Sequence, residues 1–85
     1  EFLLFRARTS EGRAVVLQAQ GLLRAARGDL SGAANAYRQA LDRDPNAFGA
    51  MINLADVLGL QHDEEGALEL LETAYLRLSA TYDME

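Results

Sequence analysis

The chain has 85 residues, a formal net charge of −5 and no cysteine, and 49% of its residues are hydrophobic while 25% are charged. This composition is typical of one small globular domain and excludes a disordered chain. All eight basic residues are arginine and the acids outnumber them. We therefore expect no nucleic-acid partner, because phosphate binding needs a clustered basic face.

No apolar run approaches the roughly 20 residues that span a bilayer, so no membrane insertion is expected. The apolar run at residues 2–5 lacks the basic region and cleavage site of a signal peptide. Because the chain opens inside this run, we expect it to be a fragment of a longer protein. The absence of cysteine fits a reducing compartment such as the cytoplasm, and the periplasm stays open as an alternative.

Residues 1–13 form an N-terminal segment whose apolar side chains include Phe2, Leu3 and Phe5. We expect it to be helical, as the last turns of a preceding helix, and a free apolar arm is the alternative. The polar residues from Thr9 to Gly12 contain helix-capping types. A helix is therefore predicted to start between Glu11 and Ala14 and to run to Ala26.

Gly28 is predicted to end this helix, and Asp29 is placed to cap the next one. The second predicted helix runs from Leu30 to Arg43 and carries an apolar stripe with spacings of three and four. The stripe consists of Ala33, Ala36, Tyr37, Ala40 and Leu41. Pro45 then ends the helix, because proline disfavours the helical conformation at the residue before it. Asn46 is placed to cap the third helix.

The third predicted helix runs from Ala47 to Leu60, and Asp63 is placed to cap a fourth from Glu64 to Leu78. The packing face of the third helix is Met51, Leu54, Ala55, Val57 and Leu58. The fourth carries Ala67, Leu68, Leu71, Ala74, Tyr75 and Leu78 at helical spacing. Residues 79–85 are expected to fray. Tyr37, Met51 and Tyr75 could stack on a ligand, but core packing explains them more simply.

A shift of 34 residues places Asp29 on Asp63, Ala33 on Ala67 and Ala40 on Ala74. The first unit carries small and turn residues at Gly21, Gly28, Asp29, Ala33, Tyr37, Ala40, Leu41 and Pro45. Their spacing resembles the tetratricopeptide repeat, a 34-residue helix–turn–helix unit. The resemblance implies an all-α solenoid of four antiparallel helices in two repeats, residues 14–47 and 48–81, with a tail at 82–85.

The run from His62 to Glu65 is a loose cluster of metal-ligating types, but a zinc site needs three convergent ligands. The chain has one histidine, and the acids have capping roles. The tripeptide Arg27-Gly28-Asp29 spells a cell-adhesion motif, yet the turn itself requires the glycine and the aspartate. We therefore expect no metal, no cofactor, no catalytic residue and no enzyme activity.

The resemblance further implies a protein or peptide partner, held in a concave groove formed by the first helix of each repeat. The residues carried over to this groove are Gln18, Leu22, Ala26, Ile52, Asn53, Asp56 and Leu60, with Val15 and Ala19 beside them. Asn53 matches an asparagine that many members use to bind a peptide backbone. Members that clamp a C-terminal carboxylate use a lysine and an asparagine where this chain has Gln18 and Leu22. Without the cation such a carboxylate is poorly held, so an apolar or basic segment is the expected ligand.

Two repeats leave apolar faces at both ends of the stack. The residues expected there are Phe2, Leu3, Phe5, Leu68, Leu71, Tyr75 and Leu78. The alternative function is therefore a structural module that assembles with further copies of itself, and we expect a homo-oligomer. A third possibility is a non-catalytic appendage of a larger enzyme.

Overall fold

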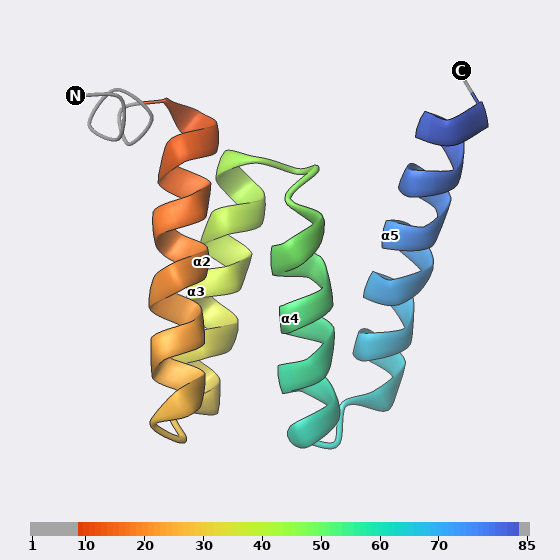
Figure 1. The fold of residues 1–85 in the computed structure, drawn as a ribbon. Coiled ribbons are helices and arrows are strands. Elements are labelled where there is room, and N and C mark those ends of the chain that lie inside the picture. The colour runs from red at the N-terminus through yellow and green to blue at the C-terminus, as the bar shows by residue number, and fades with distance from the viewer. Residues whose placement is uncertain (1–8, 84–85) are drawn as a thin grey trace.

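The computed structural model describes residues 9–83, with side chains described through residue 80, and four helices follow one another in this range. They are α2 (Ser10–Ala26), α3 (Leu30–Arg43), α4 (Phe48–Leu60) and α5 (Glu64–Asp83). Each helix runs antiparallel to the one before it (Figure 1). The predicted all-α solenoid is confirmed over these residues. The N-terminal positions Phe2, Leu3 and Phe5 lie outside the described residues.

The helix starts and turns follow the capping chemistry of the sequence. The Asp29 side chain accepts a hydrogen bond from Gly32 N at 2.9 Å, and Asp63 does the same for Gly66 N at 3.0 Å. Gly28 adopts a positive φ of 85° at the α2–α3 turn, a conformation that a residue without a Cβ adopts freely. His62 occupies the matching place in the α4–α5 turn with φ 66°.

Three predicted boundaries differ from the structure. Helix α2 starts at Ser10 rather than between Glu11 and Ala14, because Thr9 Oγ1 accepts a hydrogen bond from Gly12 N at 2.9 Å and acts as the cap. Asn46 does not cap α4; its N–H instead donates to Asp44 Oδ1 at 3.0 Å, and α4 has no side-chain cap. The predicted fraying from residue 79 is wrong as far as Asp83, where α5 ends.

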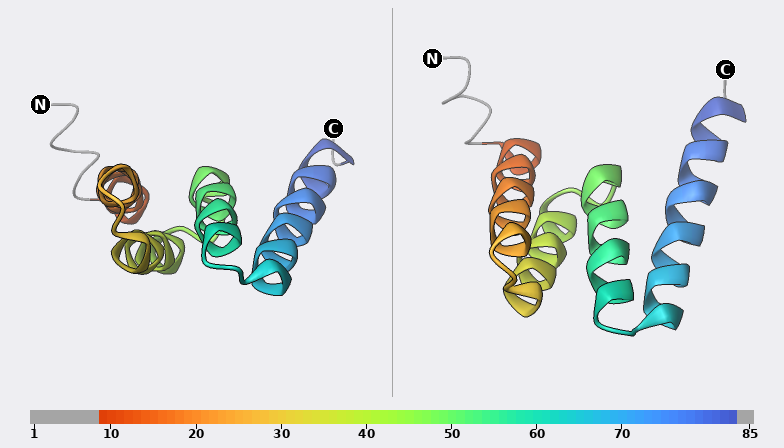
Figure 2. Two further views of the ribbon diagram at one scale, coloured as in Figure 1. Left: turned by 90° about the horizontal axis from the view of Figure 1, so that it is seen from below. Right: turned by 60° about the horizontal axis from the view of Figure 1, so that its bottom comes forward.

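The helices pack as two hairpins, α2 with α3 and α4 with α5, and α3 joins the hairpins by packing on α4. The result is a flat slab with principal-axis extents of 41 × 37 × 16 Å. Seen from below, α2 and α4 form one layer, with α3 and the start of α5 in the other (Figure 2). Among residues 9–83, α2 and α5 are the outermost helices, so each has a described neighbouring helix on one side only (Figure 1).

The core is built mainly from small residues. Ala33, Ala40 and Ala50 have no exposed surface, and they lie on two different helices, α3 and α4. Tyr37 and Met51 are the largest fully buried side chains, so the prediction that they pack in the core is confirmed. Small residues let helix axes approach closely, which is why a domain this thin still buries its centre.

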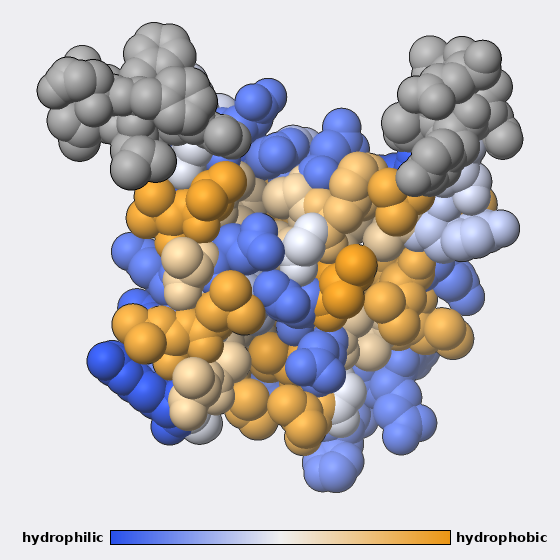
Figure 3. All heavy atoms as spheres, in the orientation of Figure 1, coloured by the Kyte–Doolittle hydropathy of each residue, from blue (hydrophilic) through white to orange (hydrophobic). Residues whose placement is uncertain are grey.

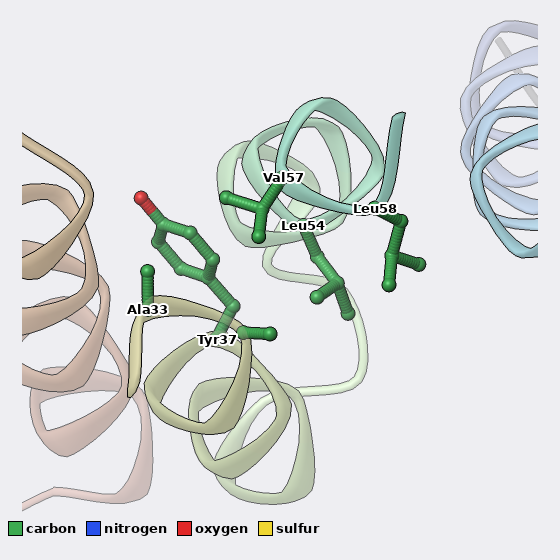
Figure 4. Close-up of a cluster of buried hydrophobic side chains, with 6 residues drawn as sticks. Ala33, Tyr37, Leu54, Val57 and Leu58 are labelled. Carbon is green, nitrogen blue, oxygen red and sulfur yellow. The ribbon is translucent and has the colours of Figure 1, made fainter. Parts of the chain in front are cut away.

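One cluster at the α3–α4 contact holds the two hairpins together (Figure 4). It consists of the buried residues Ala33, Ala34, Tyr37, Leu54, Val57 and Leu58. Arg77 of α5 adds a polar tie, because its guanidinium donates a hydrogen bond to the Pro45 carbonyl in the α3–α4 loop. The Ser10 hydroxyl makes a similar tie from the start of α2, to the Arg43 carbonyl.

Candidate functional site

The face made by α2 and α4 is the candidate binding surface. Four large apolar side chains on it stay 49–59% exposed. They are Val15 and Leu22 of α2, and Ile52 and Leu60 of α4. Figure 3 looks onto this face and shows hydrophobic side chains over α2 beside a more polar strip over α4. These exposed apolar side chains make this face the candidate for contact with a partner.

The other residues predicted for the groove differ in how open they are. Asp56 is exposed, whereas Gln18 and Asn53 are half-buried, and Ala26 is exposed at the end of α2. Gln18 reaches from α2 to α4, since a Cβ built on Gly49 would lie 2.5 Å from its Nε2. The Gln18 side chain therefore fills the space between the two helices, while Leu22 and Leu60 remain exposed on the surface.

Tyr37 forms part of the floor beneath this face. Its ring rises from α3 between α2 and α4, with the hydroxyl pointing toward the candidate surface (Figure 4). Burial raises the pKa of the Tyr37 hydroxyl above its ordinary value of 10.0, and the Asp56 carboxylate raises it further. Both effects disfavour the phenolate, so this hydroxyl is a neutral hydrogen-bonding group near neutral pH.

The outer side of α5 is a second apolar surface. Leu68, Leu71 and Tyr75 are 57%, 45% and 70% exposed, and Leu78 is 36% exposed. The prediction that Tyr75 packs in the core is therefore wrong, because no helix follows α5 among the described residues to cover it. A shallow hollow of about 410 Å³ lies on this side, lined by Leu71, Glu72, Tyr75 and Leu76. The sequence reasoning missed Leu76, which is 65% exposed.

The outer side of α2 also carries apolar residues that the sequence reasoning did not assign. Val16 is 45% and Leu23 53% exposed. A hollow of about 340 Å³ lies between α2 and α3, lined by Arg13, Val16, Leu17, Gln39 and Arg43. The signal that could have found this surface is the repeat itself. Val16 and Leu23 stand 34 residues before Ala50 and Val57, which are buried in α4.

A further hollow of about 500 Å³ lies between α3 and α5. It combines apolar side chains with both charges, and it is lined by Arg38, Leu41, Asp42, Leu54, Leu58, Asp63, Gly66, Glu69 and Leu70. No sequence motif marks it, because its width depends on how α3 and α5 each pack against α4.

Residues 9–83 were compared with the requirements of a metal cluster and of a membrane-spanning helix. Within this range, no group of three or more His, Cys, Asp or Glu side chains is placed to hold a metal ion. His62, Asp63 and Glu64 are exposed, and Asp63 caps α5. No helix in the described part of the chain is both long enough and apolar enough to cross a bilayer.

Comparison with protein families agrees with this architecture. A family model described as tetratricopeptide repeat matches residues 24–77, from the end of α2 to the last third of α5. Neither the curated proteins nor the solved structures gave a match. Two stacked helical hairpins, tight turns at Gly28 and His62, and alanines at the helix contacts are the features that this repeat requires. The chain belongs to the tetratricopeptide repeat family.

Proposed function

We propose that this protein is an interaction module that binds a segment of a partner protein along the face made by α2 and α4, acting as an adaptor or scaffold. Tetratricopeptide domains are typically non-catalytic interaction modules. The observation that carries the proposal is the exposure of Val15, Leu22, Ile52 and Leu60 on this face. Large apolar side chains contribute favourable free energy when a partner covers them and removes them from water.

The polar groups of the face indicate the chemistry of the segment. Asp56 is an exposed carboxylate on α4, which favours a basic residue in the partner. Asn53 offers both a donor and an acceptor, the pair that a peptide backbone needs. An apolar segment flanked by lysine or arginine fits this combination.

The repeat boundaries belong to the same proposal. We infer that residues 14–47 and 48–81 are the two repeats, flanked by residues 1–13 and 82–85. The cap at Thr9 adds one turn before the first repeat, and that turn is tied to the end of α3 through Ser10 and Arg43.

Selection from a displayed library of random dodecapeptides tests the groove. We expect enrichment of apolar peptides that carry lysine or arginine. Leu22→Ala and Asn53→Ala should each weaken binding of a selected peptide about tenfold, which corresponds to about 1.4 kcal/mol. Asn35→Ala is the matched control, since Asn35 is an exposed asparagine on α3 and should leave binding unchanged.

Two results would contradict the proposal. Equal losses for Asn35→Ala and Asn53→Ala would place the peptide elsewhere on the molecule. A loss of helicity in Asn53→Ala, measured by circular dichroism, would make Asn53 a structural residue and remove it from the site.

A second candidate function is self-association through the outer face of α5. The specific observation that favours it is the exposure of Leu68, Leu71, Tyr75 and Leu76 on one helix. Each such side chain gains about 1.5–3 kcal/mol when it becomes fully buried. A second copy of the chain can supply that cover.

A further inference from the structure

Charge is divided unevenly between the two helical hairpins. Residues 9–43 contain five arginines and three acids, a net charge of +2, whereas residues 44–80 contain one arginine and seven acids, a net charge of −6. Because α2 and α5 are the outermost helices (Figure 1), the two ends of the slab have opposite electrostatic character. Oppositely charged surfaces attract and orient partners before contact.

The outer side of α2 is a basic surface with an apolar centre, here named the head face. It consists of Arg13, Val16, Gln20, Leu23 and Arg24, spaced at helical intervals along α2, and all five are exposed. The Arg24 guanidinium is held over the α2–α3 turn by a 3.5 Å hydrogen bond to the Gly32 carbonyl. None of these five residues is acidic.

The outer side of α5 is an acidic surface with an apolar centre, here named the tail face. It consists of Glu64, Leu68, Leu71, Glu72 and Tyr75, which are likewise exposed. Glu64 precedes the apolar residues along the helix, and Glu72 lies among them. The tail face contains no basic residue.

The head and tail faces correspond, through the 34-residue repeat, to the two sides of the internal contact between α3 and α4. Moving the buried α4 residues Ala50 and Val57 back by 34 positions gives Val16 and Leu23 of the head face. Moving Ala34 and Tyr37 of the same contact forward by 34 gives Leu68 and Leu71 of the tail face. The head and tail faces are therefore the two halves of one further α3–α4-type contact.

Charged residues distinguish this further contact from the internal one. Ala47 and Leu58 of the second repeat correspond to Arg13 and Arg24 of the head face, and Leu30 and Arg38 of α3 correspond to Glu64 and Glu72 of the tail face. In the internal contact, Leu58 is buried and Leu30 packs against the same cluster. The head face thus carries arginine and the tail face carries glutamate, so the charges of the two faces are complementary.

We propose that copies of this chain associate head to tail, with the tail face of one copy packed on the head face of the next in the register of the α3–α4 contact. This inference rests on the self-association proposed above and specifies its polarity. Tail-to-tail pairing would bring Glu64 and Glu72 of two copies together, and head-to-head pairing would bring arginines together, so like charges oppose both. A heterologous contact leaves one free head and one free tail, so the assembly grows beyond a dimer.

Two blocked variants and their mixture test this polarity. The head-blocked variant is Val16→Ser with Leu23→Ser, and the tail-blocked variant is Leu68→Ser with Tyr75→Ser. All four side chains are at least 45% exposed, so the fold should persist, as circular dichroism will check. We expect each variant alone to stay at the monomer mass of 9.3 kDa in light scattering at about 50 µM. Their equimolar mixture should form a dimer and stop there, because one intact head and one intact tail remain.

The wild-type chain should show a mass that rises continuously with concentration. Leu22→Ser is the control, because Leu22 is an exposed apolar residue on the face made by α2 and α4, outside the head and tail faces, and its loss should leave the mass unchanged. If the head-blocked variant alone dimerises, the contact is tail to tail and the proposed polarity is wrong while self-association stands. If the wild-type chain is monomeric, self-association and its polarity both fail, and the groove proposal is untouched.

Salt provides a second readout of the same contact. Raising the salt concentration from about 50 to about 500 mM should weaken wild-type association several-fold, because the arginines of the head face and the glutamates of the tail face are exposed and their attraction is screened. An association that strengthens with salt would overturn the assignment of arginine–glutamate pairing.

Discussion

A close approach of α2 to α3 occurs at Gly21. A Cβ built there would lie 2.5 Å from Tyr37 Cε1 and 2.7 Å from Tyr37 Cδ1. The Tyr37 ring is 1% exposed and sits in the α3–α4 cluster, so it cannot move aside without disturbing both hairpins. The glycine that weakens α2 as an isolated helix is the residue that lets the core tyrosine fit.

Gly21→Ala should therefore destabilise the protein even though alanine is the better helix former. Overpacking costs about 1–3 kcal/mol, and the gain in helix propensity returns at most about 1 kcal/mol. We expect a net loss of up to about 2 kcal/mol in the free energy of unfolding, measured by urea denaturation.

Gly59→Ala is the matched control for this substitution. Gly59 also lies within a helix, α4, but a Cβ there meets no atom within 4 Å. This variant should gain about 0.5–1 kcal/mol. If both alanine variants stabilise the protein equally, the contact between Gly21 and Tyr37 does not limit how closely α2 and α3 pack.

At the scale of the element, the helices are delimited by short polar contacts rather than by propensity. Asp29 and Asp63 cap α3 and α5 in the same way, each accepting from the N–H three residues later. Helix α4 begins without a side-chain cap. Packing stabilises this helix instead, since α4 contributes six buried residues to the centre of the slab.

Removal of the α5 cap should have a measurable cost. Asp63→Ala leaves the Gly66 N–H without its acceptor and should lower the free energy of unfolding by about 1 kcal/mol. Asp63→Asn keeps a capping oxygen and should remain within a few tenths of a kcal/mol of the wild type. Thermal and urea denaturation distinguish the two. Equal stabilities for the alanine and asparagine variants would show that the cap does not stabilise α5.

At the scale of the whole molecule, the slab is 16 Å thin and buries few large side chains. Much of its core consists of alanines, which remove little apolar surface from water. A domain of this size keeps only a small margin of stability. Association through the end faces would add to that margin by mass action.

The melting temperature should accordingly rise with protein concentration. Between about 5 and about 200 µM we expect an increase of several degrees for the wild type, because association stabilises the folded state. The tail-blocked variant, Leu68→Ser with Tyr75→Ser, should melt at one temperature throughout this range. A wild-type melting temperature that does not change with concentration would contradict the coupling of stability to assembly. Differential scanning calorimetry provides the measurement.

The helix positions could be predicted because each rests on local chemistry. Leu30–Arg43 and the start of α5 at Glu64 agree with the structure, since Asp29 and Asp63 specify caps and Pro45 specifies an end. The end of α5 at Asp83 could not be predicted from local chemistry. Ser79 occupies the place where a proline is usual, so the sequence contains no residue that marks where this helix stops. The start of α2 was missed because the sequence offers more than one cap. Thr9 and Ser10 can both cap a helix, and only the geometry of the structure shows that Thr9 does so.

The candidate surfaces were predictable only in part. The family resemblance placed Leu22, Ile52 and Leu60 on the open face of their helices, and they are exposed in the structure. Val16 and Leu23 of α2 are exposed, whereas Leu17 is half-buried and Gly21 is buried on the same helix. An apolar residue on a helix becomes core or surface according to whether a neighbouring helix is present, and spacing along one helix does not contain that information.

By itself, the sequence determined four helices, a tight turn at Gly28, the small residues at the helix contacts, and membership of a repeat family. Each of these depends on residues close together in the chain or on a fixed period of 34. Only the tertiary structure decided that Gln18 lies between α2 and α4 over Gly49, that Leu76 is exposed and that Tyr37 lies beneath the face made by α2 and α4 (Figure 4). These depend on which helix sides face a neighbour, because burial arises from the packing of distant segments and not from the local pattern.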